Sequence, residues 1–307
     1  MKILVTGATG YLGAEVIQAL LADPEARVVG WGRDARRLAA VAGRFAAHGT
    51  RLTLCRVDLF DALPVPSDVG AIVHCAAMRS VSSGVDEAAL EHVNAEGTRA
   101  LLESAASETR LRFVFVSSQS VYGTAGAPWR EIDPARPETA YGRSKLAGER
   151  MVLAQPEGID GIVVRLARLY GATPFVRWDE LPGVFTRRAV EGKSLWIHGT
   201  GEARFELFHV RDAALAIASV VRRRRLSHDL YNLGCGGSVS VCELAKIVAS
   251  IAVEQGLSEP QIRHKMDVPV DHRRLELCID RVQADLGWRP RVALREGLDG
   301  YFDACAA

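Results

Sequence analysis

Two residues suited to acid–base chemistry, Tyr141 and Lys145, stand four positions apart at the start of a predicted helix. That spacing places both side chains on one face of the helix, about 6 Å apart. A free tyrosine, with a pKa of about 10, is a poor acid or base at neutral pH. Because a nearby ammonium stabilises the phenolate, we expect Lys145 to lower the pKa of Tyr141. The pair therefore predicts proton transfer at a substrate oxygen.

Three glycines, Gly7, Gly10 and Gly13, follow the first predicted strand and open the first predicted helix. In this setting they allow a tight turn, close approach to a pyrophosphate, and close packing of helix on strand. Free N–H groups at the helix start favour the phosphates. The predicted dinucleotide contacts are Thr6, Gly7, Thr9, Gly10, Tyr11, Leu12 and Gly13. A cationic nicotinamide would further favour the Tyr141 phenolate, and Lys145 can hold its ribose.

The end of the second predicted strand bears on which dinucleotide binds. NAD-binding proteins usually carry an acidic residue there, which accepts a hydrogen bond from the ribose 2′-OH. Here Gly32 occupies that place, and Arg33 follows it, with Arg36 and Arg37 within a turn. Because a guanidinium can bind a 2′-phosphate through two hydrogen bonds, Arg33 favours NADP. NAD is the alternative, since Asp34 lies one position further on and can serve as the ribose acid.

Up to about residue 170 the chain alternates short β-branched runs with longer amphipathic ones. Strands are predicted over 3–5, 27–31, 52–55, 71–74, 113–117 and 161–165, and helices over about 11–22, 34–47, 83–106 and 139–155. This alternation predicts an α/β fold of the Rossmann type, a doubly wound parallel sheet with helices on both faces. His74 ends one of these strands, where a packed, hydrogen-bonded histidine is favoured over a general base.

After Gly171 the pattern changes, with prolines and glycines over 172–210 and a helix over 181–191. Further helices are predicted over about 211–224, 240–255 and from 294, with one strand over 229–233. Because these strands are too few for a second large sheet, we expect a smaller substrate-binding lobe. The predicted domains are a Rossmann domain over 1–171 and a lobe over 172–307, from which segments of about 205–235 return to the Rossmann domain.

Composition argues against several classes of protein. A formal net charge of +1 disfavours nucleic acid or a membrane surface as partner. Six scattered cysteines without a Cys-x-x-Cys pair predict neither disulfides nor a metal site, and favour a reducing compartment. The N-terminus resembles no signal peptide, and no apolar run approaches the roughly 20 residues of a membrane span. We therefore expect a cytoplasmic protein that acts on a small molecule.

The spacing Gly-x-x-Gly-x-x-Gly after Thr6, together with Tyr141 and Lys145, resembles the short-chain dehydrogenase/reductase superfamily. Further motifs extend the resemblance over nearly the whole chain, to the extended branch of NAD(P)-dependent epimerases and dehydratases. These motifs are His74-Cys-Ala-Ala77, Asn94-x-x-Gly97-Thr98, Val116-Ser-Ser-Gln-Ser-Val-Tyr-Gly123, Leu169-Tyr-Gly171, Phe208-His-Val-Arg-Asp212, Tyr231-Asn-Leu-Gly234 and Leu286-Gly-Trp-x-Pro290. The resemblance implies an NAD(P)-dependent oxidoreductase that forms a homodimer through the predicted helices at 83–106 and 139–155.

The resemblance also implies roles for particular residues. The catalytic hydroxyl falls on Ser118, with Ser120 as the alternative and Ser117 as a strand end. Asp58, Leu59 and Ala76 are implied cofactor contacts, although Asp58 can equally be a turn cap. The implied substrate-binding residues are Arg79, Ser80, Ser118, Ser120, Tyr141, Arg168 and Arg204.

Four positions depart from the family's patterns. Its dehydratases carry two acidic residues after the catalytic hydroxyl, where this chain has Gln119 and Ser120, which argues against dehydration. Its nucleotide-sugar enzymes carry an arginine where this chain has Phe205, beside Arg204, and another where it has Val268. Because a diphosphate needs such cations, these two differences argue against a nucleotide-diphosphate sugar.

Three functions are consistent with these residues. The first is a nucleotide-sugar 4-epimerase or 4-ketoreductase, in which Tyr141 moves the O4 proton while hydride moves at C4. The second is an NADPH-dependent reductase of a non-sugar carbonyl or natural-product intermediate, favoured by the Arg33 pattern and the displaced arginines. The third, a non-catalytic dinucleotide sensor, is disfavoured by the complete set of Ser118, Tyr141 and Lys145.

Overall fold

The computed structural model describes residues 1–60, 65–79, 86–105, 110–154, 158–266 and 271–306. Seven parallel strands form its large sheet, in the order β11-β6-β5-β4-β1-β2-β3. They are β1 (Lys2–Thr6), β2 (Arg27–Gly32), β3 (Leu52–Arg56), β4 (Val69–His74), β5 (Leu111–Ser118), β6 (Ile159–Leu166) and β11 (Leu230–Leu233). The central strands β4 and β6 contain short apolar runs that are buried on both faces. The expected parallel sheet is confirmed.

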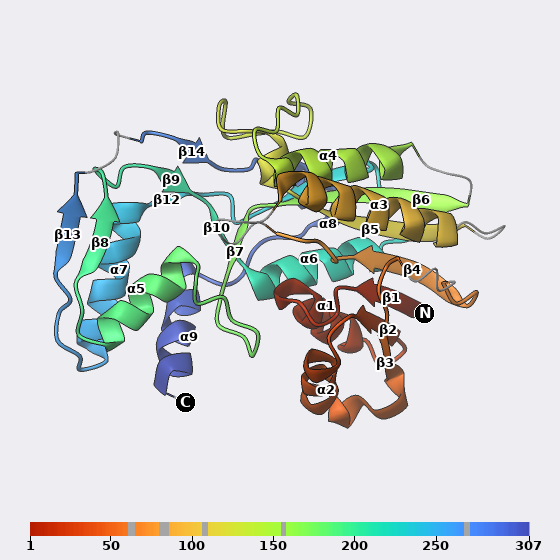
Figure 1. Ribbon diagram of the computed structural model, residues 1–307, viewed down its shortest axis with the longest axis horizontal. Coiled ribbons are helices and arrows are strands. Elements are labelled where there is room, and N and C mark those ends of the chain that lie inside the picture. Colours follow the sequence, from red (N-terminus) through yellow and green to blue (C-terminus); the bar gives the residue numbers. More distant parts are fainter. Residues whose placement is uncertain (61–64, 80–85, 106–109, 155–157, 267–270, 307) are drawn as a thin grey trace.

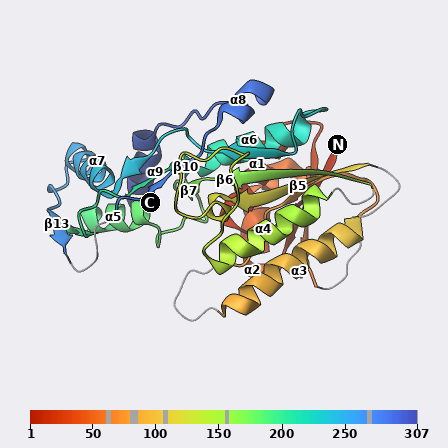
Figure 2. The same ribbon diagram turned by 90° about the horizontal axis from the view of Figure 1, so that it is seen from above.

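Helices cover both faces of this sheet (Figures 1 and 2). On one face α1 (Tyr11–Leu21) packs against α6 (Val210–Arg222), and α2 (Ala35–Arg44) joins the same core through Val41. On the other face α3 (Glu87–Ala105) packs against α4 (Ala140–Leu153). There Leu101 and Leu102 of α3 bury against Phe113 and Phe115 of β5. The fold is therefore doubly wound, as predicted.

A smaller lobe lies beyond one end of the sheet, at the left of Figure 1. It contains the helices α5 (Leu181–Val190), α7 (Val241–Glu254) and α9 (Leu294–Ala306), and short strands. These strands are β8 (Leu195–His198), β9 (Arg204–Phe205), β12 (Val239–Ser240), β13 (Ile262–Lys265) and β14 (Arg274–Leu275). The lobe has its own apolar core, which includes Phe185, Leu244 and Phe302. Strands of two to four residues are too short to show a period, so the sequence did not predict them.

The chain passes between the lobe and the large sheet more than once. β7 (Arg168–Tyr170) pairs with β10 (Leu207–His209), α6 then packs on α1, and β11 pairs with β6. α8 (Asp280–Leu286) packs against β11. The domain boundary at residue 171 stays a prediction. Among the helices of the described ranges, none is long and apolar enough to cross a membrane.

Candidate active site

A cleft of about 1210 Å³ follows the carboxyl ends of the sheet strands, from the loop after β1 to the start of α5. The strand register brings these ends together, because Thr6 lies beside His74 and Ser118 beside Leu166. The predicted site residues that line the cleft are Thr6, Gly7, Thr9, Gly10, Tyr11, Leu12, Gly13, Arg33, Asp58, Leu59, Ala76, Arg79, Ser118, Ser120, Tyr141, Lys145 and Arg168. Ser80 and Val268 lie outside the described residues, and Arg204 lies elsewhere.

The loop between β1 and α1 has glycines where side chains would not fit. Gly7 has a φ of +67°, and a Cβ there would lie 2.8 Å from the Ala76 nitrogen. A Cβ on Gly13 would overlap the Gly7 carbonyl oxygen, so α1 could not begin so close to β1. The first turn of α1 lines the cleft, and its free N–H groups and dipole favour an anion. These residues fit the diphosphate of a dinucleotide.

At the ends of β2 and β3 the cleft offers both a cation and carboxylates. The Asp34 carboxylate caps α2 by accepting from the Arg37 nitrogen at 3.0 Å, and this hydrogen bond lowers the pKa of Asp34. Arg33 is about two-thirds exposed and lies 4.0 Å from Asp58. Asp58 accepts from the Phe60 nitrogen at 3.2 Å, so it caps a turn and also lines the cleft. Arg33 is thus free to meet a further anion, whereas Asp34 is already hydrogen-bonded.

Helix α4 carries Tyr141 and Lys145 into the cleft. The Thr139 hydroxyl caps the helix by accepting from the Gly142 nitrogen at 3.0 Å. The Lys145 ammonium lies 5.8 Å from the centre of the Tyr141 ring and donates to the Val116 carbonyl at 2.8 Å. Burial lowers the pKa of Lys145 to about 8. The two side chains share one face of the helix, as their spacing predicted.

The cations that act on Tyr141 differ from the expected one. Burial raises the pKa of the Tyr141 phenol, while the guanidiniums of Arg79 and Arg177 lower it. The sequence pointed to Lys145 for this role, but its ammonium is directed to the Val116 carbonyl. Two arginines, from the segments after β4 and β7, therefore contribute to the electrostatics of the site.

Two hydroxyls lie at the cleft end of β5. Ser118 Oγ is 3.0 Å from Ser120 Oγ, and both residues are half-buried. Ser117 is buried and donates to the carboxylate of Glu149, as expected of a strand end whose side chain turns inward. Gln119 is buried, and its Oε1 has no hydrogen-bond partner among the described residues. Ser118 and Ser120 thus offer neutral hydroxyls in the cleft that Tyr141 also lines, without a carboxyl group on residues 117–120.

A buried ion pair fixes α4 against the sheet. Arg165 on β6 donates to the two oxygens of Glu149 on α4, at 2.9 and 2.7 Å. The Arg165 guanidinium also lies 4.5 Å from the centre of the Tyr122 ring. Because loss of either charge would leave the other buried and unpaired, this pair resists rearrangement. It therefore positions the helix that carries Tyr141 and Lys145.

His74 is a packed residue, as expected. It is 1% exposed, with Nδ1 2.7 Å from Thr6 Oγ1 and Nε2 3.1 Å from Thr98 Oγ1. Burial, and then the Lys145 ammonium, lower the pKa of His74 to about 3. The imidazole is therefore neutral near pH 7 and joins β1, β4 and α3 at the floor of the cleft.

Arginines line the end of the cleft near α5. Arg79 donates to Glu180 at 2.8 Å, and Arg168 lies 3.7 Å from the other oxygen of the same carboxylate. The Arg177 guanidinium lies 4.7 Å from the centre of the Tyr11 ring. Sequence reasoning missed Arg177 and Glu180, because the segment between β7 and α5 has no period or motif. The one feature of the sequence that could have indicated them is their position between Gly171 and the next predicted helix, beyond the carboxyl end of a strand.

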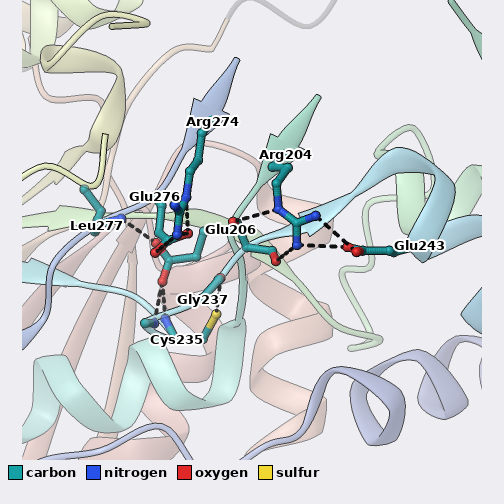
Figure 3. Close-up of polar contacts among 10 residues, drawn as sticks. Arg204, Glu206, Cys235, Gly237, Glu243, Arg274, Glu276 and Leu277 are labelled. Atoms are coloured by element: carbon teal, nitrogen blue, oxygen red, sulfur yellow. Dashed lines mark hydrogen bonds and ion pairs between the residues drawn. The ribbon is translucent and has the colours of Figure 1, made fainter. Parts of the chain in front are cut away.

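Arg204 is not among the residues that line the cleft, contrary to expectation. Figure 3 shows its guanidinium directed to Glu243 instead. It donates to the Ser238 carbonyl at 2.7 Å and lies 2.9 Å from Glu243. The reason is the register of β9, which pairs Arg204 with Ser240 of β12 at the start of α7. Close by in Figure 3, Glu206 is buried and accepts from the nitrogens of three residues, and burial raises its pKa to about 7. This carboxylate is held within the fold.

The cleft joins an anion-binding loop to a phenol, an ammonium and a hydroxyl at one edge of a parallel sheet. That combination defines an oxidoreductase of the short-chain dehydrogenase/reductase type, in which a dinucleotide and a substrate oxygen meet over Tyr141. The chain belongs to the NAD-dependent epimerase/dehydratase family, which it matches over residues 3–234. It is therefore an enzyme of an NAD-dependent family, and the dinucleotide-sensor alternative is set aside.

Relatives of known function cover almost the whole chain. The dTDP-glucose 4,6-dehydratase of Streptomyces niveus is 32% identical, covering 97% of this chain and 90% of that protein. The dTDP-glucose 4,6-dehydratase of Streptomyces venezuelae, solved with NAD bound, is 27% identical with a TM-score of 0.81, covering 98% and 96% of the two chains. The UDP-glucuronic acid 4-epimerase of Bacillus cereus, solved with UDP-glucuronic acid and NAD, shares the fold at 24% identity, with a TM-score of 0.83 and coverage of 99% and 98%.

Proposed function

We propose that this enzyme is a nucleotide-sugar 4-epimerase or 4-ketoreductase. The observation that carries the proposal is the set of Ser118, Tyr141 and Lys145 in one cleft, with neutral side chains at Gln119 and Ser120. Relatives named for dTDP-glucose support a nucleotide sugar as the substrate. The neutral residues support hydride and proton transfer at C4 without loss of water.

In this function the chain's residues handle the proton and the charge. A bound nicotinamide supplies or accepts the hydride. Tyr141 takes the proton of the sugar O4 hydroxyl, or returns it to the ketone oxygen. Ser118 donates a hydrogen bond to that oxygen and stabilises the charge that develops there. The guanidiniums of Arg79 and Arg177 stabilise the Tyr141 phenolate, and Lys145 is placed to hold the nicotinamide ribose.

The carboxylates of the cleft support chemistry without dehydration. Loss of water from neighbouring carbons needs an acid and a base in addition to Tyr141. Of the acids that line the described part of the cleft, Asp34 and Asp58 follow β2 and β3, at the cofactor's adenosine end. Glu87 lies 3.3 Å from Arg143, and Glu180 is bonded to Arg79. Each is thus distant from the reaction or already paired.

For the cofactor we propose NADP in preference to NAD. Arg33 lines the cleft and is largely exposed, and its one ion pair among the described residues is a 4.0 Å contact with Asp58. The competing ribose acid, Asp34, is used as the cap of α2. A Cβ on Gly32 would lie 2.8 Å from Thr9 Cγ2, so an acidic side chain at that position would need Thr9 to move. The adenosine end therefore favours a 2′-phosphate, although the family's named cofactor is NAD.

An NADPH-dependent reductase of a non-sugar carbonyl is the second candidate. One observation favours it. Phe205 occupies the position where the resemblance to nucleotide-sugar enzymes implies an arginine, and the neighbouring Arg204 pairs with Glu243 instead of lining the cleft. The same Ser118, Tyr141 and Lys145 would serve in that reaction.

Incubation with UDP- and dTDP-sugars separates these candidates. A 4-epimerase interconverts the sugars with no net use of NADPH, and a 4-ketoreductase consumes NADPH in proportion to its 4-keto-sugar substrate. A product lighter by one water would show dehydration and contradict the proposal. NADPH consumption with non-sugar ketones alone would favour the second candidate.

We also propose that the enzyme is a cytoplasmic homodimer. α3 and α4 lie side by side on one face of the sheet (Figure 2), and the resemblance to family dimers places the interface on these helices. The six cysteines are all unpaired thiols, which supports a reducing compartment.

A further inference from the structure

The end of the cleft near α5 carries an excess of positive charge. Three guanidiniums, those of Arg79, Arg168 and Arg177, line this end together with one carboxylate, that of Glu180. Arg79 is bonded to Glu180 at 2.8 Å, and Arg168 is 3.7 Å from its second oxygen. Both carboxylate oxygens are thus occupied, and three positive charges stand against this one negative charge.

Arg177 is the cation with the fewest partners. It is half-buried, lies 4.7 Å from the centre of the Tyr11 ring, and makes no hydrogen bond or ion pair with other residues of the described ranges. Burial, and then the charge of Arg79, lower the pKa of Arg177. Tyr11 is itself tied in place, because its hydroxyl donates to the Gly171 carbonyl at 2.7 Å. The guanidinium therefore rests on a fixed aromatic surface with its N–H groups available.

A half-buried cation without a counter-charge is unfavourable unless a ligand supplies that charge. Arg79, Arg177 and Tyr141 line the same cleft, so a ligand charge bound there shares the cleft with the reacting atoms. Arg168 is placed differently, with its guanidinium 5.6 Å from the centre of the Phe205 ring at the edge of the lobe. The cluster therefore has a part near Tyr141 and a part near the lobe.

We propose that Arg177, supported by Arg79, binds a carboxylate of the substrate next to the carbon at which hydride is transferred. A planar guanidinium matches a carboxylate through two hydrogen bonds. The inference rests on the proposed function, and specifies its substrate class as a nucleotide-linked sugar acid. Arg168 is left to meet the diphosphate of the same substrate.

UDP-glucuronate carries a carboxylate where UDP-glucose carries a hydroxymethyl group, and the two molecules are otherwise the same. They are therefore suitable probes. Calorimetric titration of each into the full-length protein saturated with NADP+ gives both dissociation constants. We expect the wild-type protein to bind UDP-glucuronate at least about tenfold more tightly than UDP-glucose. Arg177→Met should weaken the binding of UDP-glucuronate about ten- to hundredfold and the binding of UDP-glucose by less than about threefold. Arg177→Lys should keep part of the preference.

Arg263→Met is a matched control, since Arg263 also stacks on an aromatic ring, that of Trp196, but lies outside the cleft. It should leave both dissociation constants unchanged. Equal binding of the two probes by the wild-type protein would overturn the carboxylate assignment and leave the proposed function standing. If Arg177→Met weakens the binding of both probes equally, Arg177 contacts the diphosphate. If it weakens only the binding of NADP+, Arg177 contacts the cofactor. Either result would overturn the inference. Failure to bind UDP-glucose or dTDP-glucose would instead count against the proposed function.

Discussion

The Lys145 ammonium lies 5.8 Å from the centre of the Tyr141 ring and is held by the Val116 carbonyl at 2.8 Å. This single hydrogen bond is its direct polar contact in the described structure, and burial lowers the pKa of Lys145 to about 8. Because burial disfavours the charged form of Lys145, keeping this ammonium near Tyr141 lowers the free energy of unfolding. That cost can be measured.

Lys145→Met should stabilise the fold at pH 7 while abolishing turnover. The unfolded chain holds the Lys145 proton up to about pH 10.5 and the folded protein up to about pH 8, so the penalty is full below pH 8 and fades toward pH 10.5. The substitution also removes the hydrogen bond to Val116, which offsets part of the gain. We therefore expect the free energy of unfolding to rise by about 2 kcal/mol at pH 7 and by less at pH 10. Urea unfolding checks this, with the exposed Lys246→Met as control. A loss of stability at pH 7 would contradict it.

His74 should make the fold sensitive to acid. Its pKa is about 6.5 in the unfolded chain and about 3 in the folded protein, so the unfolded state gains a proton as pH falls below 6.5. The wild-type protein should then lose up to about 1.4 kcal/mol per pH unit from this residue between about pH 6 and 4. Unfolding of His74→Gln should show a slope smaller by that amount, whereas the exposed His272→Gln should keep the wild-type slope. Equal slopes for all three proteins would refute the assignment.

Arg33 should decide the cofactor preference. Arg33→Ser removes an exposed cation at the adenosine end, so NADPH should bind about ten- to hundredfold more weakly and NADH almost unchanged. Fluorescence titration with each cofactor measures this. Arg36→Ser is the matched control, since Arg36 is exposed on the same turn but does not line the cleft. If Arg33→Ser weakens both cofactors equally, Arg33 does not recognise a 2′-phosphate.

The dimer should be detectable without any variant. Sedimentation velocity at micromolar concentration should give a mass near twice the 33.3 kDa of one chain. Dilution should separate a weak dimer from a stable one. A monomer throughout the concentration range would rule out the proposed pairing of α3 and α4.

Regular spacing made part of the site readable from the sequence. Tyr141 and Lys145 share a helix face because they are four residues apart, and the glycines after β1 mark where α1 begins. The alternation of a strand likewise explains why Ser117 turns inward to Glu149 while Ser118 meets Ser120 at the cleft. These relations are local, so sequence patterns contain them.

Other parts of the site depend on contacts between distant segments. Arg177 lies in an irregular stretch and reaches Tyr11 only through the packing of the β7–α5 segment on α1. Arg204 was misplaced because the register of a two-residue strand directs it to α7. The raised pKa of Tyr141 also follows from tertiary burial, which spacing does not reveal.

Tyr141→Phe tests the central claim most directly, with turnover of a nucleotide sugar and the dissociation constant of the cofactor measured on the same preparation. The variant keeps the aromatic ring and removes only the hydroxyl. We predict that turnover falls about a hundred- to ten-thousandfold, while cofactor binding changes by less than about threefold. Turnover at the wild-type rate would show that the Tyr141 hydroxyl transfers no proton, and would contradict the account.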